Sequence, residues 1–298
     1  MEKSSITFLG TGSAVPTKKT NHTSILFTFK DENILIDCGE GTQRQFRYAD
    51  LSPTKVTKIL ITHWHGDHFL GIPGLLQTLF TSEYKKTLEI YGPKYSKEYF
   101  SLIKRLLNNI KIKTEIKEVS KKVFENKDFI IEAEQMSHGI PSNAYSIKIK
   151  DKIRLDKNKI KKLSLPNSPL LKDLQKGKDI IFNGKKIKSS SVSYLEKGKK
   201  ITIILDTLPN SNAIKLAKDS DILITEASFL KEESEKAKKY RHLTAEQSAL
   251  IAKKAKVKKL ILIHLSQRYE NFPEKILIEA KKIFKNVSIA KDLDKIEI

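Results

Sequence analysis

The sequence of 298 residues has little cysteine, no long apolar run and few arginines, and the first two shortages each exclude a class of protein. Cys38 is the only cysteine, which excludes a disulfide framework and a zinc site built on thiolates. We expect Cys38 to be a small buried apolar residue. No apolar run approaches the roughly 20 residues that a membrane-spanning helix needs, and residues 1–4 lead directly into a strand rather than a signal-peptide core. We therefore expect a cytoplasmic protein without a membrane partner.

The basic residues are numerous but are not spread evenly. The net charge is +21, and only six of the 56 basic residues are Arg, a bias toward Lys that an AT-rich genome also produces. Residues 148–200 carry 17 Lys and Arg against 5 Asp and Glu, which gives +12 in under a fifth of the chain. Clustered basic residues bind phosphate backbones and release counterions. The distribution therefore points to a polyanionic partner.

Four strong metal ligands lie within six positions directly after a run that is typical of a buried strand: His63, His65, Asp67 and His68. His63 and His65 are two residues apart, so on extended backbone their side chains point the same way and can hold one ion. Asp67 and His68 follow the Gly66 turn and face a different point. Two adjacent metal ions are implied. A nitrogen- and carboxylate-rich set without thiolates suits Zn²⁺ best, with Mn²⁺ or Fe²⁺ as alternatives.

The spacing of apolar residues predicts alternating strands and helices. Strands are expected at residues 5–9, 24–29, 33–37, 58–61, 87–91, 129–135, 144–150, 200–205, 222–224, 260–263 and 287–290. Helices are expected at residues 39–50, 69–82, 94–109, 212–218, 244–256 and 273–285. Two β-rich halves with helices outside predict an α/β fold of four layers, as one large domain over residues 1–298. Residues 151–197 are rich in turn signals and poor in apolar runs, and we interpret them as a flexible inserted arm.

Three further metal-ligating residues each follow a predicted strand. His138 follows the strand at 129–135, Asp206 the strand at 200–205 and His264 the strand at 260–263. Taken singly, a residue of this kind more often has a structural role, but the common placement at strand ends favours a metal site. A carboxylate can share its two oxygens between ions roughly 3.5–4 Å apart, so Asp206 is the candidate bridging ligand.

With these residues in view, the sequence closely resembles the metallo-β-lactamase superfamily and, within it, the short form of ribonuclease Z, a family of tRNA 3′-processing endonucleases. The matching motifs follow the family order at residues 8–12, 37–43, 63–76, 137–139, 206–209 and 264–269. The resemblance spans residues 5–269. It implies the αββα four-layer sandwich of that superfamily, with residues 151–197 as an inserted basic arm that binds tRNA.

The resemblance also implies roles for the site residues. One zinc ion is expected at His63, His65, His138 and Asp206, and the other at Asp67, His68, Asp206 and His264. Glu226 and His242 stand in two further family motifs, each with one conservative change nearby, and Glu226 is expected to orient His242. Two zinc ions lower the pKa of a bridging water from ~15.7 toward ~7. Asp67 is then expected to accept or orient a proton of that water and His242 to protonate the leaving 3′ oxygen, leaving a 3′-hydroxyl and a 5′-phosphate.

Residues expected to bind RNA lie in two regions. The family loop Pro-x-Lys-x-Arg-Asn appears at residues 16–21, where Lys18 and Asn21 are kept and Thr20 replaces the Arg. Arg268 belongs to the motif at residues 264–269. In the arm, a Ser-Pro pair replaces the family Gly-Pro, and the residues expected to contact tRNA there are Pro169, Lys172 and Lys176. The family further implies precursor tRNA as the substrate and a homodimer in which the arm of one subunit holds the tRNA that the other processes.

Two other functions compete with this interpretation. The superfamily also contains hydrolases of small substrates, including phosphodiesterases, that share these ligands. A segment that carries +12 favours RNA over a small substrate. A non-catalytic RNA-binding protein is the second alternative, and it conflicts with the presence of all seven ligand positions. Measuring bound metal separates the catalytic from the non-catalytic alternative.

Overall fold

The computed structural model describes residues 4–108 and 110–298, and it divides the chain into two compact units. The larger unit comprises Met1–Glu125, Ile131–Ile147 and Lys200–Ile298. The smaller unit comprises Asn126–Ile130 and Lys148–Lys199. Among the described residues, no helix is both long and apolar enough to cross a membrane.

The first sheet has seven strands in the order β18-β1-β2-β3-β4-β5-β6. Their bounds are β1 Ser4–Gly10, β2 Ser24–Phe29, β3 Glu32–Ile36, β4 Lys58–Leu60, β5 Leu88–Gly92, β6 Thr114–Glu118 and β18 Lys295–Glu297. Strands β18, β1, β2 and β3 pair antiparallel, and β3 to β6 pair parallel. The carboxyl ends of β3 and β4 therefore meet at one edge of the sheet.

The second sheet has seven strands in the order β17-β16-β15-β14-β9-β8-β7. Their bounds are β7 Lys122–Glu125, β8 Phe129–Gln135, β9 Asn143–Ile149, β14 Lys200–Ile204, β15 Ile222–Glu226, β16 Lys259–Ile263 and β17 Val287–Ile289. Strands β14 to β17 pair parallel. Parallel strands covered on both faces are continuous apolar runs, and β14, β15 and β16 consist almost entirely of buried Ile, Leu and Thr.

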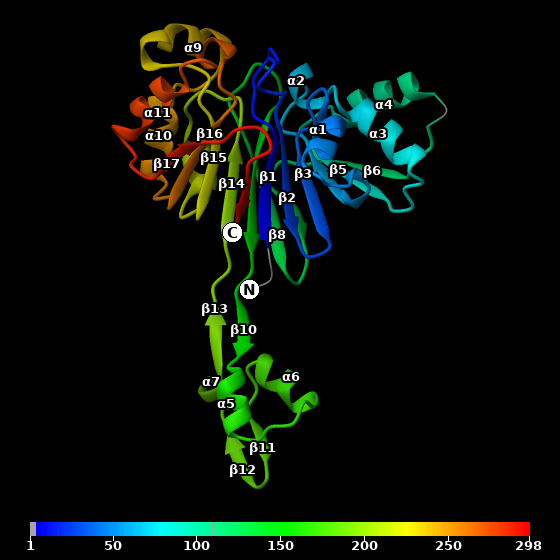
Figure 1. Ribbon diagram of the computed structural model, residues 1–298, viewed down its shortest axis with the longest axis vertical. Helices are drawn as coiled ribbons and strands as arrows, with labels where there is room; N and C mark the ends of the chain where they lie inside the picture. Colours follow the sequence, from blue (N-terminus) through cyan, green and yellow to red (C-terminus); the bar gives the residue numbers. More distant parts are fainter. Residues whose placement is uncertain (1–3, 109) are drawn as a thin grey trace. The chain divides into compact units, whose positions relative to one another are not determined.

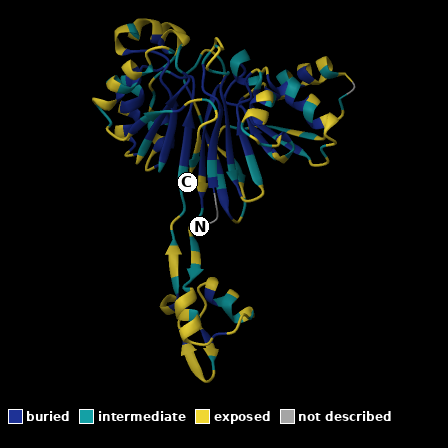
Figure 2. Ribbon diagram, viewed as in Figure 1, coloured by how far each residue is buried: buried dark blue, intermediate teal, exposed yellow. Residues whose placement is uncertain are grey.

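Helices lie outside both sheets of the larger unit, which gives the predicted α/β layers (Figure 1). They are α1 Thr42–Tyr48, α2 Gly66–Phe69, α3 Ile72–Thr81, α4 Ser96–Leu107, α8 Ser211–Ala217, α9 Ser234–Tyr240, α10 Ala245–Lys254 and α11 Pro273–Lys281. Phe46, Leu79 and Phe100 from α1, α3 and α4 join one buried cluster with the first sheet. Leu216 and Ile276 from α8 and α11 join another with the second. Figure 2 shows the strands as the most deeply buried layer of this unit.

Some predicted elements differ from those observed. The helix predicted over residues 69–82 is two helices, α2 and α3, which break at Gly71. A Cβ on Gly71 would lie 2.0 Å from the carbonyl oxygen of Gly39, so the chain turns where the two backbones touch. Pro73 occupies the first turn of α3, where the missing N–H costs no hydrogen bond. Strands β6, β7 and β18 and helix α9 have no counterpart in the prediction, and Asn109 at the end of the helix predicted over 94–109 lies outside the described residues.

The smaller unit has its own secondary structure and its own buried cluster. It contains β10 Lys152–Leu155, α5 Lys157–Lys162, α6 Pro169–Gln175, β11 Ile180–Phe182, β12 Lys185–Ile187, α7 Ser189–Val192 and β13 Ser193–Glu196. Strands β10 and β13 pair antiparallel, as do β11 and β12. Leu165, Leu174, Ile180, Ile187 and Val192 form the cluster. The segment thus folds around a small core, although its sequence shows few apolar runs.

Candidate metal centre and catalytic site

The seven predicted metal ligands gather where strands of both sheets end. His63 follows β4, His138 follows β8, Asp206 follows β14 and His264 follows β16. Asp206 and His264 have positive φ values of 31° and 55°, in the left-handed region that non-glycine residues rarely adopt. Strained backbone of this kind persists only where surrounding structure holds it, and it clusters at functional sites. The strand ends therefore present these side chains at a fixed and unusual angle.

The first group consists of His63, His65, His138 and Asp206, whose candidate ligand atoms all lie within 4.8 Å of one another. His63 Nε2 and His138 Nε2 each lie 3.0 Å from His65 Nδ1. Asp206 Oδ2 lies 3.4 Å from His63 Nε2 and 3.9 Å from His138 Nε2. Zinc–nitrogen bonds of 2.0–2.1 Å in a tetrahedron place neighbouring ligand atoms about 3.3 Å apart. The spacing of this group fits one such ion.

The second group consists of Asp67, His68 and His264. Asp67 Oδ2 lies 3.3 Å from both His68 Nε2 and His264 Nε2. Asp206 also reaches this group, because its Oδ1 lies 3.4 Å from His264 Nε2 and its Oδ2 lies 3.5 Å from His68 Nε2. One carboxylate thus borders both groups, as a bridging ligand would.

Two atoms of the cluster are buried without any hydrogen-bond partner: His68 Nε2 and Asp206 Oδ1. A buried polar atom left unpaired costs free energy, so native structures seldom leave one without a ligand, ion or water. Both atoms face the second group. The donor set of imidazoles and carboxylates is the kind that zinc, manganese and iron accept. The residues present therefore fit a divalent metal site on their own chemistry.

A second layer of contacts fixes the orientation of the histidines. His68 Nδ1 donates to Asp37 Oδ2 at 2.7 Å, and Asp37 also accepts from Thr62 N and Thr62 Oγ1, each at 2.7 Å. His138 Nδ1 donates to the carbonyl oxygen of Arg241 at 3.1 Å, and Ser228 Oγ lies 3.1 Å from His264 Nδ1. Such partners leave Nε2 free for a metal.

Asp37 and Ser228 received no role in the sequence prediction. Asp37 directly follows β3 and is fully buried with a φ of 55°. A carboxylate at the end of a buried strand, inside a recognised motif, is the signal that could have found it. Ser228 is two residues from Glu226, and its contact with His264 joins positions 36 residues apart. No local sequence pattern reports a contact of that kind.

The pKa shifts of the imidazoles follow from their neighbours. Burial lowers the pKa of His63, His65 and His138, which keeps these rings neutral and their lone pairs available to a metal. Burial also lowers the pKa of His68, but carboxylates led by Asp206 and Asp37 outweigh that effect and raise it well above its usual value. A position that holds a proton among carboxylates is one where a metal cation can replace the proton.

Glu226 and His242 form a hydrogen-bonded pair beside the two groups. Glu226 is fully buried, and its oxygens accept from Thr207 N at 2.8 Å, Ser228 Oγ at 2.7 Å and His242 Nδ1 at 2.9 Å. Burial alone would lower the pKa of His242, but the carboxylates of Glu226 and Asp206 raise it to about 9. His242, whose pKa is raised, is thus paired with the Glu226 carboxylate, which also accepts hydrogen bonds from Thr207 and Ser228.

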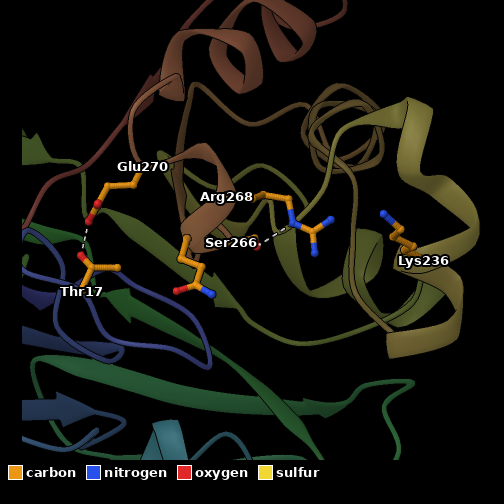
Figure 3. A pocket seen from close by; sticks show the side chains of 6 residues that line it. Thr17, Lys236, Ser266, Arg268 and Glu270 are labelled. Carbon is orange, nitrogen blue, oxygen red and sulfur yellow. Dashed lines mark hydrogen bonds between the residues drawn. The ribbon is translucent and has the colours of Figure 1, made fainter.

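A cavity of about 390 Å³ opens over the cluster. Its lining includes His65, His138, His242 and His264 together with residues 13–15 and Arg268. A second cavity of about 610 Å³ shares Ser266, Gln267 and Arg268 with the first and continues to Thr17 and Lys236 (Figure 3). The two cavities thus lie next to each other, on either side of residues 266–268. Sites for small ligands commonly have volumes of about 300–1,000 Å³, so either cavity can hold a nucleotide.

The residues predicted to bind RNA are dispersed. Lys18 is exposed, whereas Asn21 is engaged internally, since its Nδ2 donates to the carbonyl oxygen of Glu40 at 2.7 Å. Arg268 lines both cavities and is held by Glu233 and Ser266. In the smaller unit, Pro169 and Lys172 line a cavity of about 430 Å³, and Lys176 caps the end of α6. Arg268 thus lines the cavity over the metal cluster, Lys18 and Asn21 belong to the loop whose residues 13–15 also line it, and Pro169, Lys172 and Lys176 belong to the smaller unit.

Residue Cys38 occupies the position expected of it. Its side chain is fully buried, and burial raises the pKa of the thiol to about 12. A buried protonated thiol is a packing residue rather than a nucleophile or a ligand.

Known proteins are similar to this chain in sequence and in architecture. The ribonuclease Z of Nanoarchaeum equitans is 38% identical over 98% of this chain and 92% of its own. The crystal structure of human tRNase Z, short form, matches with a TM-score of 0.71 at 26% identity over 98% of each chain. The metallo-β-lactamase fold protein YhfI of Bacillus subtilis matches with a TM-score of 0.73 at 19% identity over the full length of both chains.

One family model also matches, over residues 4–277; it is described as Anti-Pycsar protein Apyc1. This span includes the seven candidate ligands and the pair Glu226 and His242. The YhfI likeness shows the fold alone, which is that of the metallo-β-lactamases. The chain therefore belongs to the ribonuclease Z family of metallo-β-lactamase fold proteins and, over residues 4–277, to the set of proteins that the Apyc1 model describes.

Proposed function

We propose that this protein is a metal-dependent endoribonuclease that removes the 3′ trailer from precursor tRNA. The observation that carries the proposal is membership in the ribonuclease Z family over nearly the whole chain, with all seven candidate ligands gathered at adjacent strand ends. Its products are a tRNA with a 3′-hydroxyl and a trailer with a 5′-phosphate. Action on tRNA would place the protein in the cytoplasm.

The cofactor that we propose is a pair of Zn²⁺ ions per subunit, with Mn²⁺ or Fe²⁺ as alternatives. One would be held by His63, His65, His138 and Asp206, and the other by Asp67, His68, Asp206 and His264. Bound metal supplies an acidified water and neutralises charge on the phosphodiester. The two unpaired buried atoms, His68 Nε2 and Asp206 Oδ1, support this assignment.

Proton transfer falls to residues of the chain itself. Asp67 uses Oδ2 toward His68 and His264, and no described residue hydrogen-bonds to its Oδ1, which is the atom proposed to take a proton from the attacking water. His242 is protonated at neutral pH because its pKa is raised to about 9, so it can donate to the leaving 3′ oxygen. Glu226 occupies His242 Nδ1 and leaves Nε2 to donate. We thus propose His242 as the catalytic acid and Glu226 as the carboxylate that orients it.

Substrate binding is proposed for both units. Near the metal cluster, Arg268 and Lys18 supply cations, and Asn21 shapes the loop that carries Lys18. In the smaller unit, Pro169, Lys172 and Lys176 are proposed to contact tRNA, supported by the net +12 of residues 148–200. We further propose that residues 151–197 act as the inserted arm and that the protein works as a homodimer, which sedimentation velocity would measure.

Hydrolysis of a small phosphodiester is the second candidate function. The cavity of about 390 Å³ over the cluster could hold such a substrate, and the Apyc1 family model covers the same residues as the ribonuclease Z matches. The basic smaller unit, which a small substrate does not need, favours RNA.

The deciding experiment incubates zinc-loaded protein with a trailer-bearing precursor tRNA and maps both new ends. The proposal predicts one cut directly after the discriminator nucleotide, with a 3′-hydroxyl and a 5′-phosphate. Cyclic-phosphate ends, or an intact precursor under conditions where bis-p-nitrophenyl phosphate is hydrolysed, would reject it. The second of these results would favour the small phosphodiester.

A further inference from the structure

Asp292 lies outside every motif named above, yet its carboxylate is fully occupied beside the metal centre. It follows β17 and is half-buried. Oδ1 accepts from Thr11 N at 2.8 Å and from Thr11 Oγ1 at 2.7 Å. Oδ2 accepts from Asn21 N at 2.6 Å and from Gln45 Nε2 at 3.2 Å. No Lys or Arg among the described residues pairs with it, so the carboxylate is stabilised by hydrogen bonds from four neutral donors.

Thr11 and Asn21 are the two ends of one loop. Residues 12–20 leave β1 and return toward β2, and the base of the loop is closed by Asp292 and by a backbone hydrogen bond from Gly12 N to the carbonyl oxygen of Asn21 at 2.8 Å. We call residues 12–20 the rim loop. A single carboxylate from the C-terminal part of the chain therefore clamps both ends of the rim loop.

The rim loop forms a wall of the opening above the metal cluster. Residues 13–15 line the cavity that contains His242 and His264, and Thr17 lines the neighbouring cavity (Figure 3). Lys18 and Lys19 are exposed on the same loop. The rim loop therefore borders the space over the metal cluster that a substrate would occupy.

The clamp also contacts a candidate metal ligand through one residue. Thr11 donates to Asp292 with its N–H and its hydroxyl, and its carbonyl oxygen accepts from His264 N at 2.7 Å. Asp292 therefore holds the rim loop and the backbone of His264 through the same threonine. These contacts help to set the distance between the rim loop and the backbone of His264.

His264 and the rim loop differ in the other contacts that hold them in place. His264 directly follows β16, whose pairing with β15 ends at Ile263, and Ser228 Oγ lies 2.8 Å from the carbonyl oxygen of His264. Apart from Asp292, four side-chain contacts hold the rim loop: Thr23 Oγ1 to the carbonyl oxygen of Gly12 at 2.8 Å, His22 Nε2 to that of Ala14 at 3.3 Å, Thr17 to Glu270, and Lys19 Nζ to Asn271 at 3.1 Å. Only the first of these is fully buried. We therefore expect loss of Asp292 to loosen the ends of the rim loop at Thr11 and Asn21, whereas His264 keeps its position after β16.

We propose that Asp292 is a positioning residue that fixes the rim loop relative to the metal centre and thereby sets which phosphodiester of the RNA is cut. The inference rests on the proposed endonuclease function. The ends of the rim loop are pinned to the backbone that carries His264, so a strand of RNA lying against the loop meets the cluster at a fixed register. Asp292 does not touch the reacting atoms.

The test compares Asp292→Asn with Asp294→Asn. An amide at position 292 keeps one acceptor oxygen, but its NH₂ faces two of the four donors in either orientation, so half the clamp is removed. Asp294 is exposed on the same segment, and its side chain accepts from Lys291 N, so it gives the same change in charge away from the clamp. Thr11→Val removes one donor with little change of shape and is a milder second variant.

For Asp292→Asn we expect cuts at the neighbouring phosphodiesters besides the original one, and a KM for precursor tRNA about tenfold higher, which corresponds to ~1.4 kcal/mol. Hydrolysis of bis-p-nitrophenyl phosphate and metal content should stay within about twofold of the wild type. The reason is that, among the described residues, Asp292 hydrogen-bonds to Thr11, Asn21 and Gln45 and to no candidate metal ligand. Thr11→Val should shift the same quantities less, and Asp294→Asn should match the wild type. Hydrogen exchange of peptides covering residues 11–22 should be faster in Asp292→Asn, independently of activity.

A single cut at the wild-type position with an unchanged KM would overturn the inference. So would a loss of small-substrate hydrolysis in proportion to the loss of tRNA cleavage, because Asp292 would then be a general support of the metal site. If wild-type protein itself leaves precursor tRNA intact, the proposed function fails instead, and that result is separate because it appears before any variant is compared.

Discussion

The charged groups at the candidate metal centre of the larger unit are largely buried, whereas most of those in the smaller unit are exposed. In the larger unit, Glu226 and Asp206 are buried, and the atoms around them are fixed by hydrogen bonds or lie at ligand spacing. In the smaller unit, ion pairs such as Lys197 with Asp151 and Lys186 with Asp179 are largely exposed, and exposed pairs contribute little to stability. Cleaving a bond requires fixed geometry, whereas attracting a phosphate backbone requires charge density. This contrast is expected if the larger unit carries out the cleavage and the smaller unit attracts the RNA.

The strongest test of the contrast removes the bridging carboxylate. Asp206→Ala should lose metal and all hydrolysis, of precursor tRNA and of bis-p-nitrophenyl phosphate alike, because Asp206 borders both ligand groups. Asp50→Ala is the matched control, since Asp50 is exposed and also has a positive φ, of 54°. Metal content and both activities check the outcome. Retention of two metal ions in Asp206→Ala would contradict the bridging role.

His242→Ala should slow cleavage of precursor tRNA by roughly 10²- to 10⁴-fold, the usual span for a positioned general acid. Metal content should remain that of the wild type, because His242 Nδ1 is taken by Glu226. Metal analysis and single-turnover cleavage measure the two quantities. If the variant came out metal-free, His242 would be a ligand and the proposed acid would be lost.

Deleting residues 151–197 should separate the two substrates. Cleavage of precursor tRNA should fall by roughly 10²-fold or more at physiological salt, whereas hydrolysis of bis-p-nitrophenyl phosphate should be spared. The ends of the segment can be joined by a short linker, because Ile149 N donates to the carbonyl oxygen of Lys199 at 2.8 Å. Parallel loss of both activities in a folded, metal-loaded variant would show that the segment belongs to the catalytic site.

A milder version replaces three exposed lysines of α5, Lys157, Lys161 and Lys162, with Gln. The control makes the same charge change at Lys275, Lys281 and Lys285 in the larger unit, which are also exposed. Removing one lysine–phosphate interaction lowers the slope of log affinity against log salt by about 0.7–0.9. The slope should fall by up to about 2.1–2.7 in the α5 variant, if all three lysines contact phosphates, and by less in the control. Equal decreases would mean that charge acts without regard to position.

The smallest effect concerns pH. His242 must be protonated to donate, and the carboxylates beside it raise its pKa to about 9, so cleavage should hold at neutral pH and fall about tenfold per pH unit above that pKa. Metal ions bound to Asp206 would reduce its share of this shift, so the limb should lie at lower pH with metal than without it. Glu226→Gln should move the limb to lower pH. An unchanged limb in that variant would remove His242 as its source.

The same contrast explains what could be predicted from the sequence. The candidate ligands could be named from the sequence because His63, His138, Asp206 and His264 each come soon after a buried apolar strand, and strand ends gather at a sheet edge. Resemblance to a known family supplied the pairing of Glu226 with His242, which no local spacing contains. Thr17 and Glu270, or Asp292 and Thr11, meet across more than 250 positions. Contacts of that kind are set by tertiary packing, so sequence reasoning gave Asp292 no role.

Local sequence patterns failed where elements are short or half-exposed. Strands β6 and β7 alternate charged with partly buried residues, so they carry no continuous apolar run. In the smaller unit the serine triplet at residues 189–191 is a composition typical of a flexible joint. It instead starts the turn α7, where Ser189 is buried and its hydroxyl donates to the carbonyl oxygen of Leu174 at 2.7 Å. That hydrogen bond and the burial of Val192 in the core of the smaller unit hold the turn.

The most direct test of the central claim is the position of bound metal. Crystals of zinc-loaded protein should give two anomalous peaks at the zinc absorption edge. One should lie among His63, His65 and His138, and the other among Asp67, His68 and His264, with Asp206 between them. A single peak, or a peak coordinated by Glu226 and His242, would contradict the account, because Glu226 and His242 would then bind metal rather than serve as orienting carboxylate and acid.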